Sequence, residues 1–369
     1  MKSFMKPFLA SLLVAMCALR PAQAGWVEHV EDGIMGTRIT IELWAQDAAQ
    51  GRSAIEAVLA EMRRIDRDMS TFKPDSEVSR VNALAAGQSV PISQELFDLL
   101  SDAVDYSRIT AGAFDITYAS VGYLYDFRNH VRPNEERIAR SLPGIDYRHL
   151  MLDRNSRSIK FAREGVRIDL GGIGKGHAVD RGIAALQARG IRRALITAGG
   201  DSRIIGDRFG KPWVVGIRHP DRKDEVIARI PLEDAAISTS GDYERYFDED
   251  GVRYHHIIDP GTGRPASKVR SATIIASTAT RTDGLSKTAF VLGPERALDI
   301  YNRLEDVDAI LITLDGHVLY TRGLMAPDPS RPDSNSSAAI GAEGQADAQG
   351  GKVRGGKVKG NTPPPQDPN

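Results

Sequence analysis

The chain has 369 residues, with 48 lysines and arginines against 49 aspartates and glutamates, and a formal net charge of −1. This balance argues against a nucleic-acid-binding protein, which would present a basic face. The single cysteine, Cys17, lies near the N-terminus. Without that segment the chain can form no disulfide, no thiolate metal site and no cysteine nucleophile.

The N-terminal segment predicts export. Two lysines lie within the first six residues, and Pro7–Leu19 is an apolar stretch too short to span a bilayer. Ala22-Gln-Ala24 supplies the small-x-small pattern of a cleavage site, so residues 1–24 are expected to be a signal peptide. A short membrane anchor and a buried helix are the alternatives. A lipoprotein is disfavoured, because Met16 stands where a lipid-attachment signal before Cys17 needs a small residue.

The C-terminal segment predicts disorder. Residues 327–369 are rich in proline, serine, glycine, alanine, aspartate and asparagine, and they offer almost nothing to bury. Residues 25–326, about 300 in number, are enough for one large domain or two closely joined lobes.

The body begins with a strand and two helices. Residues 39–43 alternate between apolar and polar, which predicts a half-buried strand. Apolar residues then recur at helical spacing from Ile55 to Met69. The run Leu96–Ser107 has the same spacing and predicts a second amphipathic helix, capped by Ser93.

The rest of the body mixes strands with helices. Helices are predicted at Gly176–Arg189, stopped by Gly190, and at Pro294–Leu304. Asp250-Gly251 and Asp315-Gly316 are hairpin signals, which imply antiparallel pairing. Strands are predicted at Ser158–Phe161, Val166–Leu170, Ala194–Thr197, Trp213–Ile217 and Ala309–Leu314. This order favours an α+β fold, with mixed and antiparallel sheets and flanking helices, over a doubly wound sheet.

The densest chemical signal is the glycine-rich segment Asp169–Gly176, between a predicted strand and a predicted helix. Glycines let the backbone approach an anion, and a helix start aims N–H groups at it. The segment is not a P-loop, which needs glycine in place of Asp169 and serine or threonine in place of Gly176. It is not the dinucleotide fingerprint either, because His177 takes the last glycine position. Alone, it fits a tight structural turn equally well.

Other polar segments share the same domain. Gly199-Gly-Asp201, Ser238–Asp242 and His256–Gly263 combine glycines, hydroxyls and carboxylates with few apolar side chains. Each alone is typical of a surface turn, but several such segments in one domain favour a functional site. Asp283, before an apolar run, is either a helix N-cap or a hard oxygen ligand for magnesium.

Taken together, these residues resemble the ApbE family, the FAD:protein FMN transferases. The matching segments follow the family's order over nearly all of residues 33–293. They are Met35–Thr37, Ile65–Asn82, Gly112–Asp115, Asp169–Asp180, Gly199–Asp201, Ala236–Arg245, His256–Gly263 and Asp283–Gly293.

The resemblance implies a magnesium-dependent, exported transferase. Such enzymes split the pyrophosphate of FAD, pass FMN to a threonine hydroxyl of a periplasm-facing redox partner, and release AMP. Membrane-bound respiratory subunits are the expected partners, and the expected location is the periplasm, free or at the inner membrane. A periplasmic FAD pyrophosphatase that yields FMN and AMP, or a non-catalytic FAD carrier, remains an alternative.

The resemblance also implies roles for individual residues. His256 is the candidate general base, although a histidine that merely bonds a turn would look the same, and His255 beside it should point the other way on a strand. Asp283 is the second catalytic candidate. The implied flavin and adenosine contacts are Met35, Ala113, Phe114, Asp115, Gly171, Lys175, His177 and Ile258. The implied magnesium ligands are the carbonyl of Gly174 and the side chains of Asp283, Ser286 and Thr288.

Two positions depart from the family pattern. A threonine usually follows the metal-binding aspartate by four residues, and here that position is Lys287, which cannot ligate magnesium when charged. Phe72 stands where relatives carry tyrosine or a small polar residue, and an aromatic ring there favours stacking on the flavin and transfer over hydrolysis. The acceptor protein and the oligomeric state are not indicated, and no acceptor pattern in this chain predicts self-modification.

Overall fold

The computed structural model describes residues 24–222 and 225–324. Its centre is an eight-stranded sheet in the order β1-β2-β6-β7-β10-β13-β14-β15, and every neighbouring pair is antiparallel. The strands are Gly25–Ile34, Thr37–Ala45, Ala194–Ala198, Asp201–Ile205, Ala236–Gly241, Ser271–Ala276, Asp308–Ile312 and Val318–Tyr320. Helices and antiparallel strands therefore form the α+β fold that the sequence predicts.

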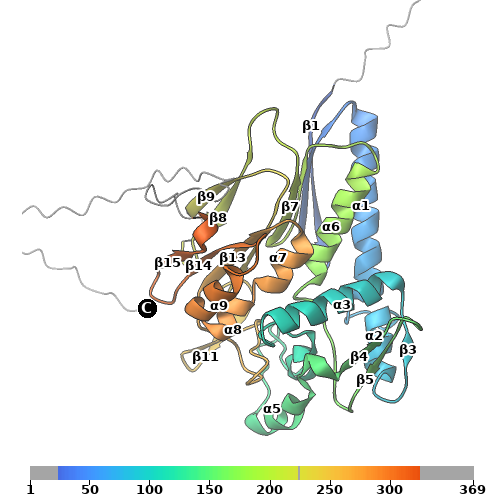
Figure 1. Ribbon diagram of the computed structural model, residues 1–369, viewed down its shortest axis with the longest axis vertical. Coiled ribbons are helices and arrows are strands. Elements are labelled where there is room, and N and C mark those ends of the chain that lie inside the picture. The colour runs from blue at the N-terminus through green and yellow to red at the C-terminus, as the bar shows by residue number, and fades with distance from the viewer. Residues whose placement is uncertain (1–23, 223–224, 325–369) are drawn as a thin grey trace, which may run out of the picture.

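Two long helices cover one face of the sheet (Figure 1). They are α1 (Ala48–Met69) and α6 (Gly174–Gln187). The alternation in β2 explains the contact, because Ile39, Ile41 and Leu43 are fully buried in the same core as the apolar side of α1. Burial of such a side chain contributes about 1.5–3 kcal/mol.

The opposite face of the sheet is covered by a hairpin, β8 (Trp213–Arg218) with β9 (Val226–Leu232). Trp213 and Ile230 from the hairpin share a second apolar cluster with Ile204 and Ile237 of the sheet. Because both faces are covered, the central strands have apolar residues on both sides.

The chain between α1 and α6 builds the lower part of the molecule in Figure 1. Helix α3 (Gln94–Ile109) crosses below α1 and α6, and Ser93 caps it by accepting from the Leu96 amide at 3.2 Å. The other elements here are α2 (Glu77–Leu84), α4 (Ala119–Gly122), α5 (Glu135–Ser141), β3 (Val90–Pro91), β4 (Leu150–Asp153) and β5 (Ser158–Phe161). One continuous apolar core joins this part to the sheet.

The remaining elements are two hairpins and three short helices. Asp250 and Gly251, both with positive φ, connect β11 (Tyr246–Glu249) to β12 (Val252–His255), as the Asp-Gly signal predicts. Asp315-Gly316 likewise lies between β14 and β15. The helices are α7 (Ala279–Leu285), α8 (Thr288–Leu292) and α9 (Pro294–Tyr301). Within residues 24–222 and 225–324, no helix is long and apolar enough to cross a bilayer.

Some predictions differ from the structure: the helix predicted at Pro294–Leu304 ends at Tyr301, and the strand predicted at Ala309–Leu314 is Asp308–Ile312. Val166–Leu170 is not a strand, because side chains take its backbone groups: Asn82 both accepts from the Ile168 amide at 2.8 Å and donates to the Ile168 carbonyl at 2.9 Å. Asp283 is not a helix N-cap, since Thr278 caps α7. Helix α6 begins two residues before the predicted Gly176. The expected signal peptide and the tail from Pro327 fall outside the described residues, except for Ala24.

Helices α6 and α7 approach closely, and two features hold them together. Asp180 of α6 accepts from the Ala279 and Thr280 amides at the start of α7, at 2.9 and 2.8 Å. At Gly176 a Cβ atom would lie 2.2 Å from the Ala279 carbonyl oxygen and 2.9 Å from Asp283 Cβ. Only glycine therefore permits this approach.

We expect Gly176→Ala to destabilise the protein by about 1–3 kcal/mol, because the added methyl group meets a backbone oxygen that cannot move away alone. The helix propensity of alanine, worth up to about 1 kcal/mol, is too small to reverse the sign. Urea unfolding measures the difference. Gly87→Ala is the control, since its Cβ would meet its nearest neighbour, the Leu84 carbonyl oxygen, at 3.8 Å. Equal stability of the two variants would contradict the close approach.

Candidate active site at the glycine-rich loop

The glycine-rich loop, residues 169–173, leads directly into α6 and is fastened through Asp169. That carboxylate accepts from Thr71 Oγ1 at 2.6 Å, from the Tyr118 hydroxyl at 3.0 Å and from the Gly171 amide at 2.6 Å. Thr71 follows α1 and Tyr118 precedes α4. Neither Thr71 nor Tyr118 was singled out in the sequence, because their bonds to Asp169 join segments far apart in the chain.

Two apolar side chains pack against the backbone of this segment. Met35, whose φ of 54° is left-handed, forms the tip of the β1–β2 hairpin with Gly36. A Cβ atom built on Gly174 would lie 3.8 Å from Met35 Cε. A Cβ atom built on Gly172 would lie 3.2 Å from Phe114 Cε2. Thus Met35 and Phe114, both implied flavin contacts, border the loop.

Two lysines and two carboxylates meet where the loop enters α6. Lys175 contacts Asp201 directly and lies 3.6 Å from Asp283 Oδ2. Lys287 contacts Asp283 Oδ1 directly. The Gly176 amide donates to Asp283 Oδ2 at 3.1 Å. Asp283 has no solvent exposure and Asp201 has 3 %, so these are interior ion pairs.

The charges of this cluster depend on one another. Burial acts to raise the pKa of Asp283, but Lys175 and Lys287 outweigh it and hold the pKa below its usual value. Burial acts to lower the pKa of Lys175, and Asp201 with Asp283 raises it instead. The pKa of Asp201 is raised, first by burial and then by the charge of Asp283. Asp283 and Lys175 are therefore ionised at neutral pH.

His256 lies beside this cluster, directly after β12. Its amide donates to the Arg245 carbonyl at 3.1 Å, and its Nδ1 is buried without a hydrogen-bond partner among the described residues. Burial lowers the pKa of His256 to about 3, and the charges of Arg245 and Lys287 add to this shift. The ring is therefore neutral at pH 7, whereas the ordinary pKa of histidine would place its titration close to that pH.

His255 is oriented differently, as expected for neighbours on a strand. It is 1 % exposed and its ring lies 6.2 Å from that of Phe290 in the core. Its Nδ1 accepts from the Ile257 amide at 3.3 Å, and burial lowers its pKa to about 4. His255 thus belongs to the core rather than to the site.

Four of the residues implied to contact FAD have side chains that bond to, or pack against, other parts of the protein. Asp115, buried, accepts from the Thr117 and Tyr147 amides at 2.8 and 2.7 Å, so it shapes the turn that carries Phe114. His177 Nε2 bonds Glu95 of α3 at 2.9 Å. Ile258 packs in a separate cluster, and Ala113 is buried in the main core. Through these contacts the four residues hold the surroundings of the site in place.

Phe72, by contrast, is 94 % exposed. It directly follows Thr71, which is bonded to the loop through Asp169. A large aromatic side chain that is so exposed gains nothing from packing in this structure. It is therefore available for a planar ligand above the loop, in line with the stacking role that the resemblance implies.

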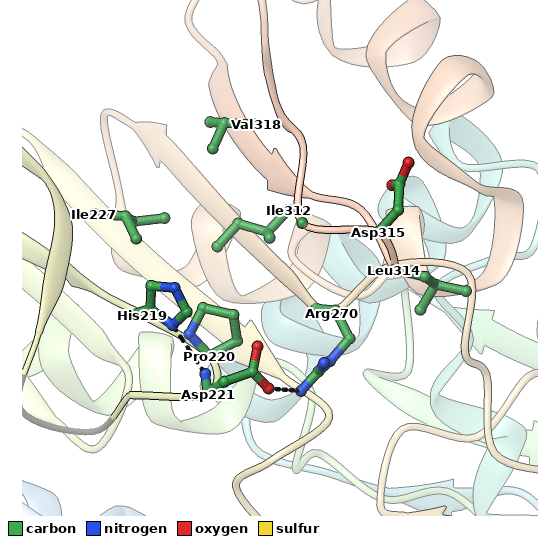
Figure 2. Close-up of a pocket in the computed structure, with 10 residues that line it drawn as sticks. His219, Pro220, Asp221, Ile227, Arg270, Ile312, Leu314, Asp315 and Val318 are labelled. Carbon is green, nitrogen blue, oxygen red and sulfur yellow. Dashed lines mark hydrogen bonds and ion pairs between the residues drawn. The ribbon is translucent and has the colours of Figure 1, made fainter. Parts of the chain in front are cut away.

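A cavity of about 230 Å³ lies apart from these residues, between β9 and the β14–β15 hairpin (Figure 2). His219, Asp221 and Arg270 line it, and Arg270 donates to Asp221 at 2.7 Å. An adjoining hollow of about 410 Å³ shares Arg270 with it. Neither includes a residue of the glycine-rich loop or of the lysine–carboxylate cluster, so we do not assign the chemistry to them.

The α+β fold and a lysine–carboxylate cluster at the start of a helix, beside a glycine-rich loop, define a protein equipped for a phosphorylated ligand. Comparison with known sequences makes this more specific. The model of the ApbE family matches residues 35–311, and the chain belongs to that family. The resemblance stated from the motifs is confirmed.

Relatives share both sequence and structure with this chain. A protein of Vibrio cholerae named FAD:protein FMN transferase is 33 % identical, covering 86 % of this chain and 97 % of its own. The Treponema pallidum protein of the same name is 30 % identical, covering 79 % and 86 %. The crystal structure of the ApbE protein of Thermotoga maritima matches with a TM-score of 0.75 and 36 % identity, over 81 % of this chain and 97 % of that one.

The metal implied by the resemblance does not fit the side chains around Asp283. Lys287 takes Oδ1, and the Gly176 amide takes Oδ2. Of the other implied ligands, Ser286 Oγ donates to the Asp283 carbonyl at 2.9 Å. Thr288 Oγ1 is buried without a hydrogen-bond partner among the described residues, and Gly174 lies against Met35. The described residues also contain no cluster of three or more histidine, cysteine or acidic side chains suited to a metal.

We expect His255 to make stability pH-dependent. Its pKa is about 4 when folded and about 6.5 when unfolded, so below pH 6.5 the unfolded chain takes up the proton first. The free energy of unfolding should therefore be about 2 kcal/mol lower at pH 5 than above pH 6.5, and it should decrease further towards pH 4. Urea unfolding of His255→Gln between pH 7.5 and 5 should show a shallower fall.

His317→Gln is the control for that measurement, because the His317 side chain is 76 % exposed. It should follow the native protein at every pH. If His255→Gln also follows the native protein, His255 does not titrate on unfolding as inferred.

Proposed function

We propose that this protein is an FAD:protein FMN transferase, the activity for which its relatives are named. The observation that carries the proposal is the cluster of Lys175, Lys287, Asp201 and Asp283 where the glycine-rich loop enters α6. Phosphoryl transfer needs hydrogen-bond donors fixed beside the phosphate oxygens and an aligned nucleophile, more than it needs a covalent intermediate, and the lysine ammonium groups and the N–H groups at the start of α6 are such donors. The exposed Phe72 near the same loop suits a flavin.

The acceptor in this proposal is a threonine hydroxyl of a partner protein. Its oxygen forms a bond to the phosphorus of the FMN half, the bond from that phosphorus to the bridging oxygen breaks, and AMP leaves with that oxygen. The hydroxyl proton passes to His256. The product is a phosphoester that fixes FMN to the partner.

His256 is the candidate acceptor of that proton because it is neutral at pH 7 and its Nδ1 has no partner in the described residues. A pKa of about 3 makes it a weak base without ligand, and the negative pyrophosphate bound beside it should raise that pKa towards the working pH. Asp283 cannot serve as a second base, since both of its oxygens are engaged. It instead holds the two lysines in place. We propose no step through magnesium, because the groups around Asp283 do not form its shell.

The location completes the proposal. The predicted signal peptide supports export, and a periplasm-facing redox subunit with a target threonine is the proposed partner. The absence of cysteine after Cys17 in the sequence is compatible with an oxidising compartment.

The proposed reaction has a direct assay. The purified protein, FAD and a flavin-accepting domain should yield a fluorescent protein band, and chromatography should find AMP in equal amount. A domain with threonine replaced by alanine should remain dark. We expect His256→Ala to lower the rate by about 100-fold or more, since general-base catalysis is removed.

His317→Ala, which changes an exposed histidine, should leave the rate unchanged. Release of FMN and AMP without an acceptor would instead identify a pyrophosphatase. Stable FAD binding without any product would identify a carrier. Full activity of His256→Ala would contradict its role as the base.

We also expect Phe72→Ala to weaken FAD binding without changing stability. Stacking of an aromatic side chain is worth about 1 kcal/mol, which corresponds to roughly a fivefold higher Kd. Flavin fluorescence titration measures the Kd, and thermal melting measures stability. Val214→Ala, which truncates another exposed apolar side chain on β8, is the matched control. An unchanged Kd for Phe72→Ala would exclude stacking.

A further inference from the structure

The ammonium group of Lys287 is surrounded by oxygens. It contacts Asp283 Oδ1, donates to the Asp283 carbonyl at 2.9 Å and donates to the Gly172 carbonyl at 3.3 Å. The side chain is 17 % exposed and Asp283 is fully buried. A carboxylate and two backbone carbonyls are the oxygen ligands that hard cations take in proteins. The lysine therefore occupies a site with the chemistry of a cation site.

A metal ion and Lys287 cannot both hold Asp283 in this arrangement. A charged ammonium has no lone pair to ligate a metal, and it would repel a divalent ion at the same oxygen. If Lys287 swung away, Asp283 would lose its closest counter-charge while still buried, which is strongly unfavourable. The Gly172 and Asp283 carbonyls would lose their donor at the same time.

We propose that the Lys287 ammonium is a tethered cation that takes the place of magnesium at Asp283. Lys287 lies on the turn between α7 and α8, four residues after Asp283, so the chain itself delivers the charge. It neutralises Asp283 and, across Gly172, fixes the glycine-rich loop against α7. The protein then needs no divalent ion at this carboxylate, either to fold or to bind FAD.

This inference concerns the same site as the proposed function but is tested by metal binding, so the two can fail separately. Isothermal titration with magnesium chloride, with and without saturating FAD, is performed on the native protein and on Lys287→Thr. The threonine removes the ammonium and restores a hydroxyl at the position where the family usually has one. Lys211→Thr is the matched control, because Lys211 is exposed and its side chain forms no ion pair in the described structure.

The native protein and Lys211→Thr should take up no magnesium at a one-to-one ratio, and EDTA should leave their Kd for FAD unchanged. Lys287→Thr should bind magnesium at least about tenfold more tightly than the native protein, and adding Asp283→Asn should abolish this gain. One-to-one magnesium binding by the native protein in either titration would overturn the proposal. Equal affinity of the native protein and Lys287→Thr would overturn it as well.

Circular dichroism and thermal melting first establish that Lys287→Thr folds. The native titration does not depend on that variant. A native protein that loses FAD binding in EDTA and regains it with magnesium would overturn the proposal by itself. Failure of FMN transfer to every acceptor would bear on the proposed function and leave these binding results unaffected.

Discussion

Burial of the Asp283 carboxylate is the constraint on which the rest of the site depends. An ionised group without solvent exposure is stable only when charges and donors inside the protein replace its hydration. Here the replacements come from different elements: Lys175 and the Gly176 amide from α6, and Lys287 from the turn after α7. The relative position of these helices is therefore fixed by the same contacts that set the charge of the site.

The antiparallel sheet brings the other parts of the site to the same place. β2 pairs with β6 so that Ile39 lies opposite Ala198, and the start of one strand meets the end of the other. The Met35-Gly36 turn before β2 and the Gly199-Gly200 turn after β6 therefore lie together. The second turn begins the strand that places Asp201 on Lys175. Strand register thus determines which loops can share a ligand.

The sequence predicted the local elements of this arrangement well, because periodicity and turn chemistry are local properties. The alternation in β2, the Ser93 cap and the Asp-Gly hairpins were all readable from a few neighbouring residues. The strand predicted at Val166–Leu170 is wrong because its hydrogen bonds are not local. Its apolar residues resemble a strand, but its partner groups are the side chains of Asn82 and Ser120, which no local pattern reveals.

The site was predictable only as a set of motifs. The sequence identified the glycine-rich loop, Lys175 and Asp283, yet it could not indicate that Asp115 is engaged with backbone amides or that Thr288 lies beside Tyr301. The sequence showed that Lys287 replaces the usual threonine, but it could not show which atoms the lysine contacts. The lysine-to-carbonyl contact at Gly172 joins residues 115 positions apart, and only the packed helices bring them together.

The difference between a lysine and a metal ion at Asp283 has a consequence for ligand binding. With Lys175 and Lys287 facing Asp201 and Asp283, two positive and two negative side chains leave the cluster without net charge. A magnesium ion in place of the second ammonium would leave it positive. Attraction to an ionised pyrophosphate must then come from groups next to the cluster, such as Arg245 by His256 and the backbone N–H groups at the glycine-rich loop. Because such contacts act at short range, this site should select its ligand by fit more than by long-range charge.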